Sequence, residues 1–270
     1  MPHQATVVGL TDVGKSRSRN EDSLSLLPDL GVAVVADGMG GHPGGDVASG
    51  VAARTAAKAL EERLGSGADA SGDPAQRLDE AMRHAVLGAH EAIRAEGQSA
   101  PDLAGMGTTI TALALDAATD LFVLGHVGDS RAYRFRDGTL TQLTRDDTWV
   151  QERVEAEQIT VEQARRHPFA HLLTQCLGLE DRPVPHISHG SVEAGDVYLL
   201  CTDGLAGMID DPTIAEILTR EFDTNGAHTD ASNAAADGKA TVKALVDAAN
   251  AAGGHDNITA VLVAISPAGD

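Results

Sequence analysis

The sequence predicts an α+β fold in which antiparallel sheets pack against outer helices. Short apolar runs are separated by turn residues, and two long helical patterns follow one another. The element order is strands, two helices, strands, a small helical insert, strand, helix, strand, which departs from the regular strand–helix alternation of a parallel sheet. No internal repeat is visible and no loop divides the chain. We therefore expect one domain over residues 1–270, with an insert near residues 144–180.

The first third of the chain predicts three strands and two helices. Residues 5–10 form the first strand candidate, and residues 11–20 form a polar loop. Residues 23–27 and 31–36 are expected to form a strand pair around Pro28-Asp29, a usual turn composition. Helical spacing then covers residues 46–64, with Asp46 as the candidate N-cap, and residues 75–95, directly after Pro74.

The rest of the chain predicts mainly strands, interrupted by a helical insert. We expect a meander, with Asp137-Gly138 as a hairpin turn, from residues 108–115, 121–127, 132–136 and 140–143. Residues 147–157 and 160–166 predict the helices of the insert, the second with a capping box from Thr160 to Gln163. The remaining elements are a strand at 197–201, a helix at 211–220, a mobile loop at 223–239, a helix at 241–252 and a strand at 258–265.

The composition limits the classes of function. The chain carries 40 acidic and 20 basic residues, which gives a formal net charge of −20. Binding nucleic acid or anionic lipid needs a basic surface, so neither is an expected partner. No apolar stretch approaches the roughly 18 residues of a membrane span and no signal-peptide pattern opens the chain, so we expect a cytoplasmic protein. Cys176 and Cys201 lie in apolar sequence and are expected to be buried, reduced thiols.

Four aspartates stand at the ends of apolar runs. Asp37, Asp129 and Asp203 follow predicted strands, and Asp256 precedes one. Because the end of one antiparallel strand lies beside the start of its neighbour, all four can share one edge. Two carboxylates about 4 Å apart repel each other by roughly 4 kcal/mol at an effective dielectric constant of 20. Such a cluster indicates bound protons or cations, and hard oxygen ligands select magnesium, calcium or manganese over zinc.

A second group of residues suggests phosphate chemistry. Gly38 has no Cβ, so its carbonyl can approach a cation closely, although an Asp-Gly pair can also simply form a turn. Arg17 lies a few residues before Glu21 and Asp22. These charges could form a solvated salt bridge of under about 1 kcal/mol. Arginine is also the side chain best shaped to grip a phosphate, so the combination favours phosphoester hydrolysis.

Six short motifs occur in order along the chain. They are Arg17-Ser-Arg-Asn-Glu-Asp22, Ala36-Asp-Gly-Met-Gly-Gly-His42, Gly105-Met-Gly-Thr-Thr109, Gly128-Asp-Ser-Arg131, Cys201-Thr-Asp-Gly-Leu205 and Gly254-His-Asp-Asn-Ile258. Together they resemble the metal-dependent (PPM-type, type 2C) serine/threonine protein phosphatases of the bacterial branch, from about residue 5 to residue 265. The resemblance implies an α-β-β-α four-layer sandwich of two antiparallel sheets flanked by helices, with magnesium or manganese at one edge.

The resemblance also implies a ligand set for two core Mn²⁺ or Mg²⁺ ions. Asp37 would bridge the two ions and orient the metal-bound water. Asp203 and Asp256 would complete the coordination of one ion. The carbonyl of Gly38 would bind the other ion, with Glu21 acting mostly through water.

Further residues acquire roles from the same resemblance. Asp129, together with Asp203, would offer a weaker third metal site. Asp22 and Asn257 would lie just outside the ligands, with Asp22 orienting metal-bound waters. Arg17 would bind the substrate phosphate, while Arg19 is treated as a solvent-facing charge.

The expected reaction is hydrolysis of phosphoserine and phosphothreonine on proteins by a metal-activated water, with no phosphoenzyme. The expected partners are phosphorylated proteins and an opposing serine/threonine kinase, and the expected oligomeric state is a monomer. Met39 stands where many eukaryotic relatives have a histidine after Asp-Gly, so the general acid is left unassigned; His42 is close in sequence. His126 and His255 are expected to pack or to form hydrogen bonds.

The insert resembles the flap that borders the active site in this family. Its Asp146-Asp147-Thr148 replaces the more usual Asp-His-Ser, and Trp149, Val150 and Val154 are expected to pack it down. The flap is where we would look for substrate choice.

Three rival functions are compatible with parts of the sequence. Cys176 and Arg182 have the Cys-x5-Arg spacing of a cysteine-dependent phosphatase. Glu180 and Asp181 would place negative charge in a loop that must bind a dianion, which argues against that class. The second rival is a pseudophosphatase that binds phosphoproteins, and the third is a metal-dependent phosphatase of small molecules.

Overall fold

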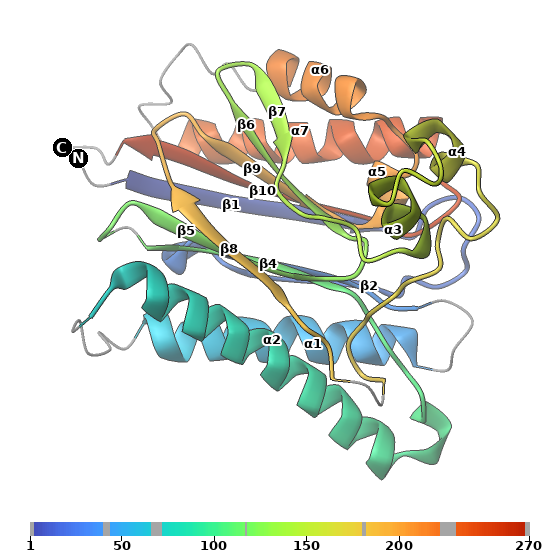
Figure 1. The fold of residues 1–270 in the computed structure, drawn as a ribbon. Helices are drawn as coiled ribbons and strands as arrows, with labels where there is room; N and C mark the ends of the chain where they lie inside the picture. The colour runs from blue at the N-terminus through green and yellow to red at the C-terminus, as the bar shows by residue number, and fades with distance from the viewer. Residues whose placement is uncertain are drawn as a thin grey trace.

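The chain folds into two stacked antiparallel sheets with helices on both outer faces (Figure 1). This computed structural model describes residues 3–39, 44–65, 72–116, 118–179, 182–221 and 231–267. Within these residues each sheet has five strands. The order in the first is β1 (His3–Asp12), β10 (Ile258–Pro267), β9 (Val197–Cys201), β6 (Arg131–Arg136) and β7 (Thr139–Gln142). The order in the second is β2 (Asp22–Leu27), β3 (Val32–Asp37), β4 (Ile110–Asp116), β5 (Leu121–Val127) and β8 (His186–Ser191).

Two long helices cover the outer face of the second sheet, and further helices cover the first. Helices α1 (Gly45–Leu64) and α2 (Pro74–Ser99) pack on β2–β5 and β8. Helix α7 (Ala231–Ala251), with α6 (Asp211–Glu221) and α5 (Asp203–Ala206), covers the first sheet (Figure 1). A third apolar layer lies between the sheets, with Tyr198 and Leu113 among its buried residues. The predicted α-β-β-α sandwich is confirmed.

Small side chains let the outer helices approach the sheets closely. All but one of the buried residues of α1 are Ala, Gly or Ser, and Ala52 and Ala56 have 0% exposure. The core of a chain with only 3% aromatic residues is thus built largely from small and aliphatic side chains. Asp73 caps α2 through its side chain, and Pro74 is the first helical residue, as its missing N–H favours. Two short 3-10 turns, Pro28–Leu30 and Pro101–Leu103, complete this half.

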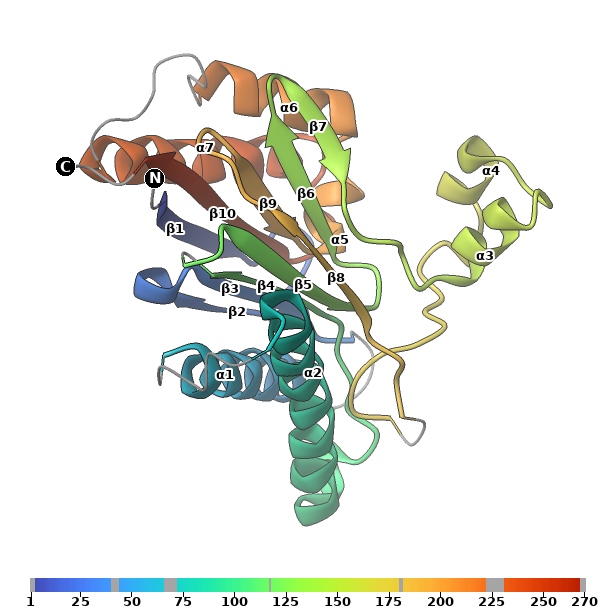
Figure 2. The same cartoon turned by 60° about the vertical axis from the view of Figure 1, so that its left-hand side comes forward.

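The insert projects from the sandwich beside one edge of the sheets (Figure 2). It contains α3 (Trp149–Glu155) and α4 (Val161–Arg165), and the predicted capping box of Thr160 with Gln163 is present. Val150 is buried, whereas Trp149 is only partly so. We call residues 144–178 the flap.

Several predicted elements are wrong. Residues 108–143 do not form one meander, because the chain changes sheets after β5: β4 pairs with β5, but β6 pairs with β7 and β9. The N-cap of α1 is Gly44 in the left-handed region, and Asp46 lies inside the first turn. Of the loop predicted at 223–239, residues 223–230 lie outside the described residues. The rest is helical from Ala231 onward, because its alanine-rich sequence favours a helix despite its polarity. Strand β8 and helix α5 were not predicted.

The register brings distant segments to one edge. Asp22 pairs with Asp37 across β2 and β3, and Cys201 pairs with Ala260 across β9 and β10. The ends of β3, β5 and β9 therefore lie near the starts of β2 and β10, as antiparallel pairing predicts. None of the helices that the structure describes is long and apolar enough to span a membrane.

Candidate active site

The backbone of Asp37 is fixed by the β4 side of the sheet. The Thr109 amide and the Thr108 hydroxyl donate to the Asp37 carbonyl at 2.9 and 2.7 Å. The Asp37 amide donates to the Thr109 hydroxyl at 3.0 Å. With the rest of β3 fully apolar and buried, Asp37 is the point at which the strand leaves the core and presents a charge.

Asp22 joins the two sheets at this edge. Its Oδ2 accepts hydrogen bonds from the hydroxyls of Thr202 at 2.8 Å and Thr259 at 2.7 Å, both from the first sheet's side. Its Oδ1 is buried and has no protein partner. This position suits the expected role just outside the metal ligands.

Asn257 holds the loop that carries the arginine and glutamate of the site. Its Oδ1 accepts from the Glu21 amide at 2.8 Å, and its Nδ2 donates to the carbonyls of Val13 and Arg19 at 3.0 and 2.8 Å. Arg17 Nη2 donates to Asp256 Oδ2 at 2.7 Å, and both side chains are partly exposed. The Arg17 guanidinium, which is expected to bind phosphate, is thus hydrogen-bonded to Asp256, an expected metal ligand. The side chain of Arg19 is exposed, as predicted.

The carboxyl groups perturb one another strongly. Burial, and next the charges of Asp22, Asp203 and Asp129, raise the pKa of Asp37 well above its usual value. Burial likewise raises the pKa of Asp22 to about 7 and that of Asp129 to about 8, with Asp203 adding to both. Burial raises the pKa of Glu21 as well. Crowded carboxylates of this kind retain protons unless a cation neutralises them.

Asp203 is the exception in the cluster. Its burial opposes ionisation, but hydrogen bonds from His171 and Asp37 outweigh that cost and lower its pKa. The pKa values of Asp37 and Asp203 therefore move in opposite directions, because each carboxyl group acts on the other. The Oδ1 of Asp203 is buried and has no hydrogen-bond partner among the described residues.

The residues fit a site for hard divalent cations. The donors are carboxylates and a backbone carbonyl. Within the part of the chain that the structure describes, a buried carboxylate oxygen of Asp22 and one of Asp203 have no hydrogen-bond partner. A Cβ on Gly38 would lie 2.1 Å from the Gly45 carbonyl oxygen, so only glycine brings the backbone this close. Among the described residues, no three His, Cys, Asp or Glu side chains already converge into a complete metal-binding group.

The structure adds one residue that the sequence did not suggest. His171, from the flap, places Nδ1 3.5 Å from Asp203 Oδ2, and its side chain is 83% exposed. No local motif marks it, since the contact depends on how the flap folds back. Thr202 and Thr259 were also missed, although both lie close to the predicted ligands in sequence.

Other candidate residues lie outside the cluster or outside the described residues. His42 falls in residues 40–43, which the structure does not describe. His126 is buried and hydrogen-bonded, as predicted, whereas His255 is exposed. Cys176 and Cys201 are free and buried, as predicted, and burial raises the pKa of the Cys176 thiol to about 11. Such a thiol is not ionised near neutral pH, which argues against a cysteine nucleophile.

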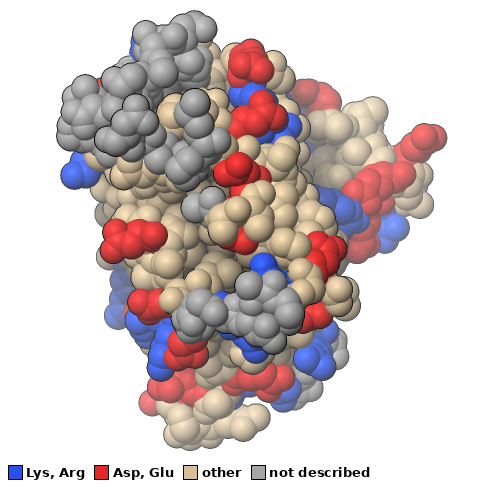
Figure 3. Space-filling view, turned by 90° about the vertical axis from the view of Figure 1, so that its left-hand side faces the viewer, with Lys and Arg blue, Asp and Glu red and all other residues tan. Residues whose placement is uncertain are grey.

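A large cavity lies at the opposite end of the sandwich. It measures about 1360 Å³ and is lined by the start of β1, the turn before β3 and the ends of α1 and α2. Figure 3 looks onto this end, where acidic and basic side chains are interspersed. We place the candidate site at the carboxylate cluster instead, because the cavity lacks its convergent buried acids.

Comparison with known proteins agrees with this geometry. Residues 14–246 match the protein phosphatase 2C family. The chain belongs to that family. The serine/threonine protein phosphatase PstP of Mycobacterium tuberculosis is 38% identical over 253 residues, covering 93% of this chain but only 43% of PstP. The present chain thus spans under half the length of that relative.

Relatives within the protein phosphatase 2C family also match over nearly their full length. Protein phosphatase PhpP of Streptococcus pneumoniae is 34% identical over 260 residues, 95% of this chain and 96% of PhpP. A solved structure of the PstP catalytic domain in complex with two manganese ions superposes with a TM-score of 0.77 at 34% identity. It covers 98% of this chain and is itself covered completely.

Proposed function

We propose that this protein phosphatase 2C family member hydrolyses phosphoserine and phosphothreonine on proteins, using water activated by divalent cations and no covalent phosphoenzyme. The observation that carries the proposal is the cluster of interacting carboxyl groups around Asp37 and Asp203 beside the Arg17–Asp256 ion pair. Relatives that are named serine/threonine phosphatases support the substrate class. All the aspartates expected as ligands are present, which disfavours a pseudophosphatase.

The expected metal ligands and Arg17 have separate roles in this proposal. Asp37, Asp203, Asp256 and the Gly38 carbonyl would hold two cations, with Glu21 at the margin. When bound, such cations lower the pKa of water and neutralise phosphoryl oxygens. Arg17 would bind the phosphoryl group through two parallel hydrogen bonds.

Two further residues complete the proposed site. Asp22, held by two threonine hydroxyls, can accept a proton through its free Oδ1. Asp129 and Asp203 together would hold a weaker third ion. A PstP structure with two manganese ions supports manganese as the cofactor, with magnesium as the alternative.

The remaining expectations stay predictions. We propose that residues 1–270 are one catalytic domain with the flap as an insert, acting as a monomer on phosphorylated proteins. An opposing serine/threonine kinase would supply these substrates, and a cytoplasmic location is the corresponding prediction.

A phosphatase assay tests the function directly. Phosphoserine and phosphothreonine peptides should release phosphate with added manganese and fail to do so without divalent cations. Nucleotides and other small phosphoesters serve as comparison substrates. Faster release from those than from any phosphopeptide would make the protein a small-molecule phosphatase.

Replacing Arg17 should separate substrate binding from metal binding. We expect Arg17→Ala to raise KM for a phosphopeptide by about tenfold or more, the scale of a lost charge-assisted hydrogen bond. Manganese affinity, measured by calorimetry, should change less, because the partly exposed Arg17–Asp256 pair contributes little. Arg19→Ala is the matched control. A larger loss of manganese affinity than of substrate affinity would refute the phosphate-binding role.

Replacing Cys176 should separate the two phosphatase classes. Cys176→Ser should keep turnover within about threefold of the original, because a buried thiol with a raised pKa supplies no nucleophile. EDTA should abolish turnover, and manganese should restore it. Loss of turnover in Cys176→Ser together with resistance to EDTA would identify a cysteine-dependent enzyme.

A further inference from the structure

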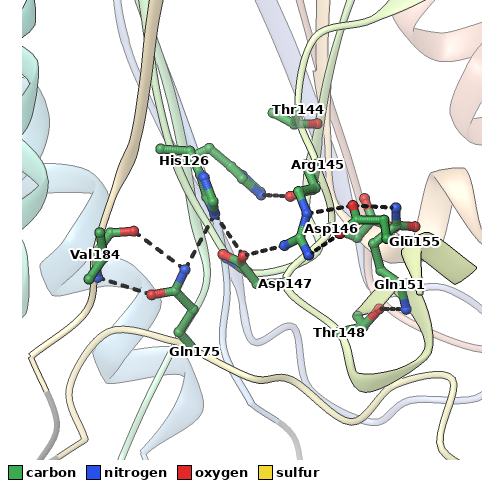
Figure 4. A network of polar contacts seen from close by, with 12 residues as sticks. His126, Thr144, Arg145, Asp146, Asp147, Thr148, Gln151, Glu155, Gln175 and Val184 are labelled. Atoms are coloured by element: carbon green, nitrogen blue, oxygen red, sulfur yellow. Dashed lines mark hydrogen bonds and ion pairs between the residues drawn. The ribbon is translucent and has the colours of Figure 1, made fainter. Parts of the chain in front are cut away.

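The base of the flap is tied to the core by a buried carboxylate. Asp147 is 1% exposed and lies at the centre of the polar network in Figure 4. Its amide donates to the Gly128 carbonyl at 2.7 Å, and its Oδ2 accepts from the Gly128 amide at 3.0 Å. One flap residue therefore binds both the amide and the carbonyl of Gly128.

Asp147 also connects the two ends of the flap to an edge strand. Its carbonyl accepts from the Thr174 amide at 2.8 Å, where the flap returns to the core. Its Oδ1 accepts from His186 Nε2 of β8 at 2.8 Å, with Arg145 Nη1 farther away at 3.5 Å. Gln175 lies beside this pair and exchanges hydrogen bonds with the backbone of Val184 (Figure 4).

A buried histidine adds a second tie. Burial lowers the pKa of His126, so the ring is neutral near pH 7. Its Nε2 lies 3.0 Å from the Arg145 carbonyl, which can only accept, so Nε2 carries the proton. Nδ1 then accepts from the Thr111 hydroxyl at 2.9 Å. The flap base is thus bonded both to β5, through Arg145, and to the turn that follows β5, through Asp147.

The Gly128 turn leads directly into the candidate site. Gly128 has φ +112°, and a Cβ there would lie 2.6 Å from the Thr109 side chain, so the turn is tightly confined. The next residue is Asp129. Thr109 in turn bonds Ser130 at 2.8 Å and holds the backbone of Asp37. A shift of the flap base therefore acts on the segment that carries Asp129.

We propose that Asp147 is a positioning residue that holds the flap base and the Asp129 turn in one fixed arrangement, with His186 orienting its carboxylate. The inference depends on the proposed function in one respect, because only that function makes Asp129 a metal ligand. The flap's attachment can be measured without any reaction.

The flap contains a tryptophan whose fluorescence can be measured. Trp149 is the only tryptophan in the chain and begins α3 two residues after Asp147. The centroid of its ring lies 5.0 Å from the ring centroid of His167 and 5.7 Å from that of Phe169. The Cζ atom of Arg153 lies over the same ring, 4.8 Å from its centroid. Its fluorescence therefore reports the packing of the flap.

Two variants test the proposal, and β8 offers a matched control. Asp147→Asn removes the charge at constant size, and His186→Ala removes the ring that donates to it. His186 and His189 have equally exposed side chains on the same strand, but His189 pairs with Asp79 of α2 at 3.0 Å. His189→Ala therefore breaks a similar pair away from the flap.

We expect both test variants to shift Trp149 emission and to speed tryptic cleavage within the flap by about tenfold, the ratio for one charge-assisted hydrogen bond. We also expect them to weaken the lowest-affinity class of manganese sites by a similar factor in calorimetric titration. His189→Ala should match the original protein in all three measurements. His186→Ala decides the question if Asp147→Asn does not fold, because it alters only a half-exposed side chain.

Two results would overturn the proposal. Unchanged fluorescence and cleavage in the test variants would show that Asp147 does not hold the flap. Faster cleavage with an unchanged manganese titration would make Asp147 a structural anchor that does not position Asp129. Failure of the original protein to hydrolyse phosphopeptides would refute the proposed function but leave the fluorescence and cleavage tests intact.

Discussion

Asp37→Asn and Asp203→Asn are each expected to lower manganese-stimulated turnover of p-nitrophenyl phosphate by at least about a hundredfold. That is the scale of losing a main electrostatic stabiliser of the transition state. An amide has no charge with which to hold a divalent cation, so either replacement removes an anionic ligand from the centre of the cluster. The measurement is initial-rate turnover across a manganese titration.

The Asp37→Asn variant should fold normally. Burial and the neighbouring charges favour the protonated, neutral form of Asp37 by raising its pKa, and an amide is neutral and of the same size, so the melting temperature in EDTA should not fall. Asp116→Asn is the matched control, because Asp116 ends β4 at the edge opposite the site. Near-normal turnover by Asp37→Asn would contradict the ligand assignment, whereas a lowered melting temperature in EDTA would contradict the raised pKa of Asp37.

The sequence predicted strands well but not their partners. The apolar runs around residues 121–127 and 132–136 indicated strands β5 and β6 correctly. Their short connection suggested a hairpin, yet β6 pairs with β9, about 65 residues away. Local patterning is the same for either partner, so the crossing between sheets at Gly128 was not visible in it. Strand β8 was missed because its exposed, polar sequence lacks an apolar alternation.

The candidate site was likewise only partly predictable from the sequence. The acids could be located from the sequence because each stands where a buried strand begins or ends, as Asp37 does after β3. The contacts that tune them could not, because they join residues far apart in the chain. Thr202 reaches Asp22 across 180 positions, and His186 reaches Asp147 across 39. These partners are ordinary threonines and histidines whose roles exist only after the fold brings them together.

Gly204→Ala should destabilise the protein and disrupt the site together. A Cβ at Gly204 would lie 1.9 Å from the carbonyl oxygen of Asn257, and no side-chain rotation relieves a clash with backbone. The side chain of Asn257 is already bonded to three backbone groups, which resist a shift. We expect the free energy of unfolding to fall by about 3 kcal/mol, the upper range for overpacking, with loss of most turnover.

Gly88→Ala, in contrast, is expected to stabilise the protein. Gly88 lies inside α2, and nothing stands within 4 Å of its added Cβ. This replacement should raise the free energy of unfolding by about 0.5–1 kcal/mol through lower entropy of the unfolded chain, with turnover unchanged. Denaturant titration measures both effects. If Gly204→Ala were as stable as the original, the β9–α5 junction would have room to move. Asp203 and Asp256 would then not be held together by the close approach of Gly204 to Asn257. Their juxtaposition would instead depend on the cations that they bind.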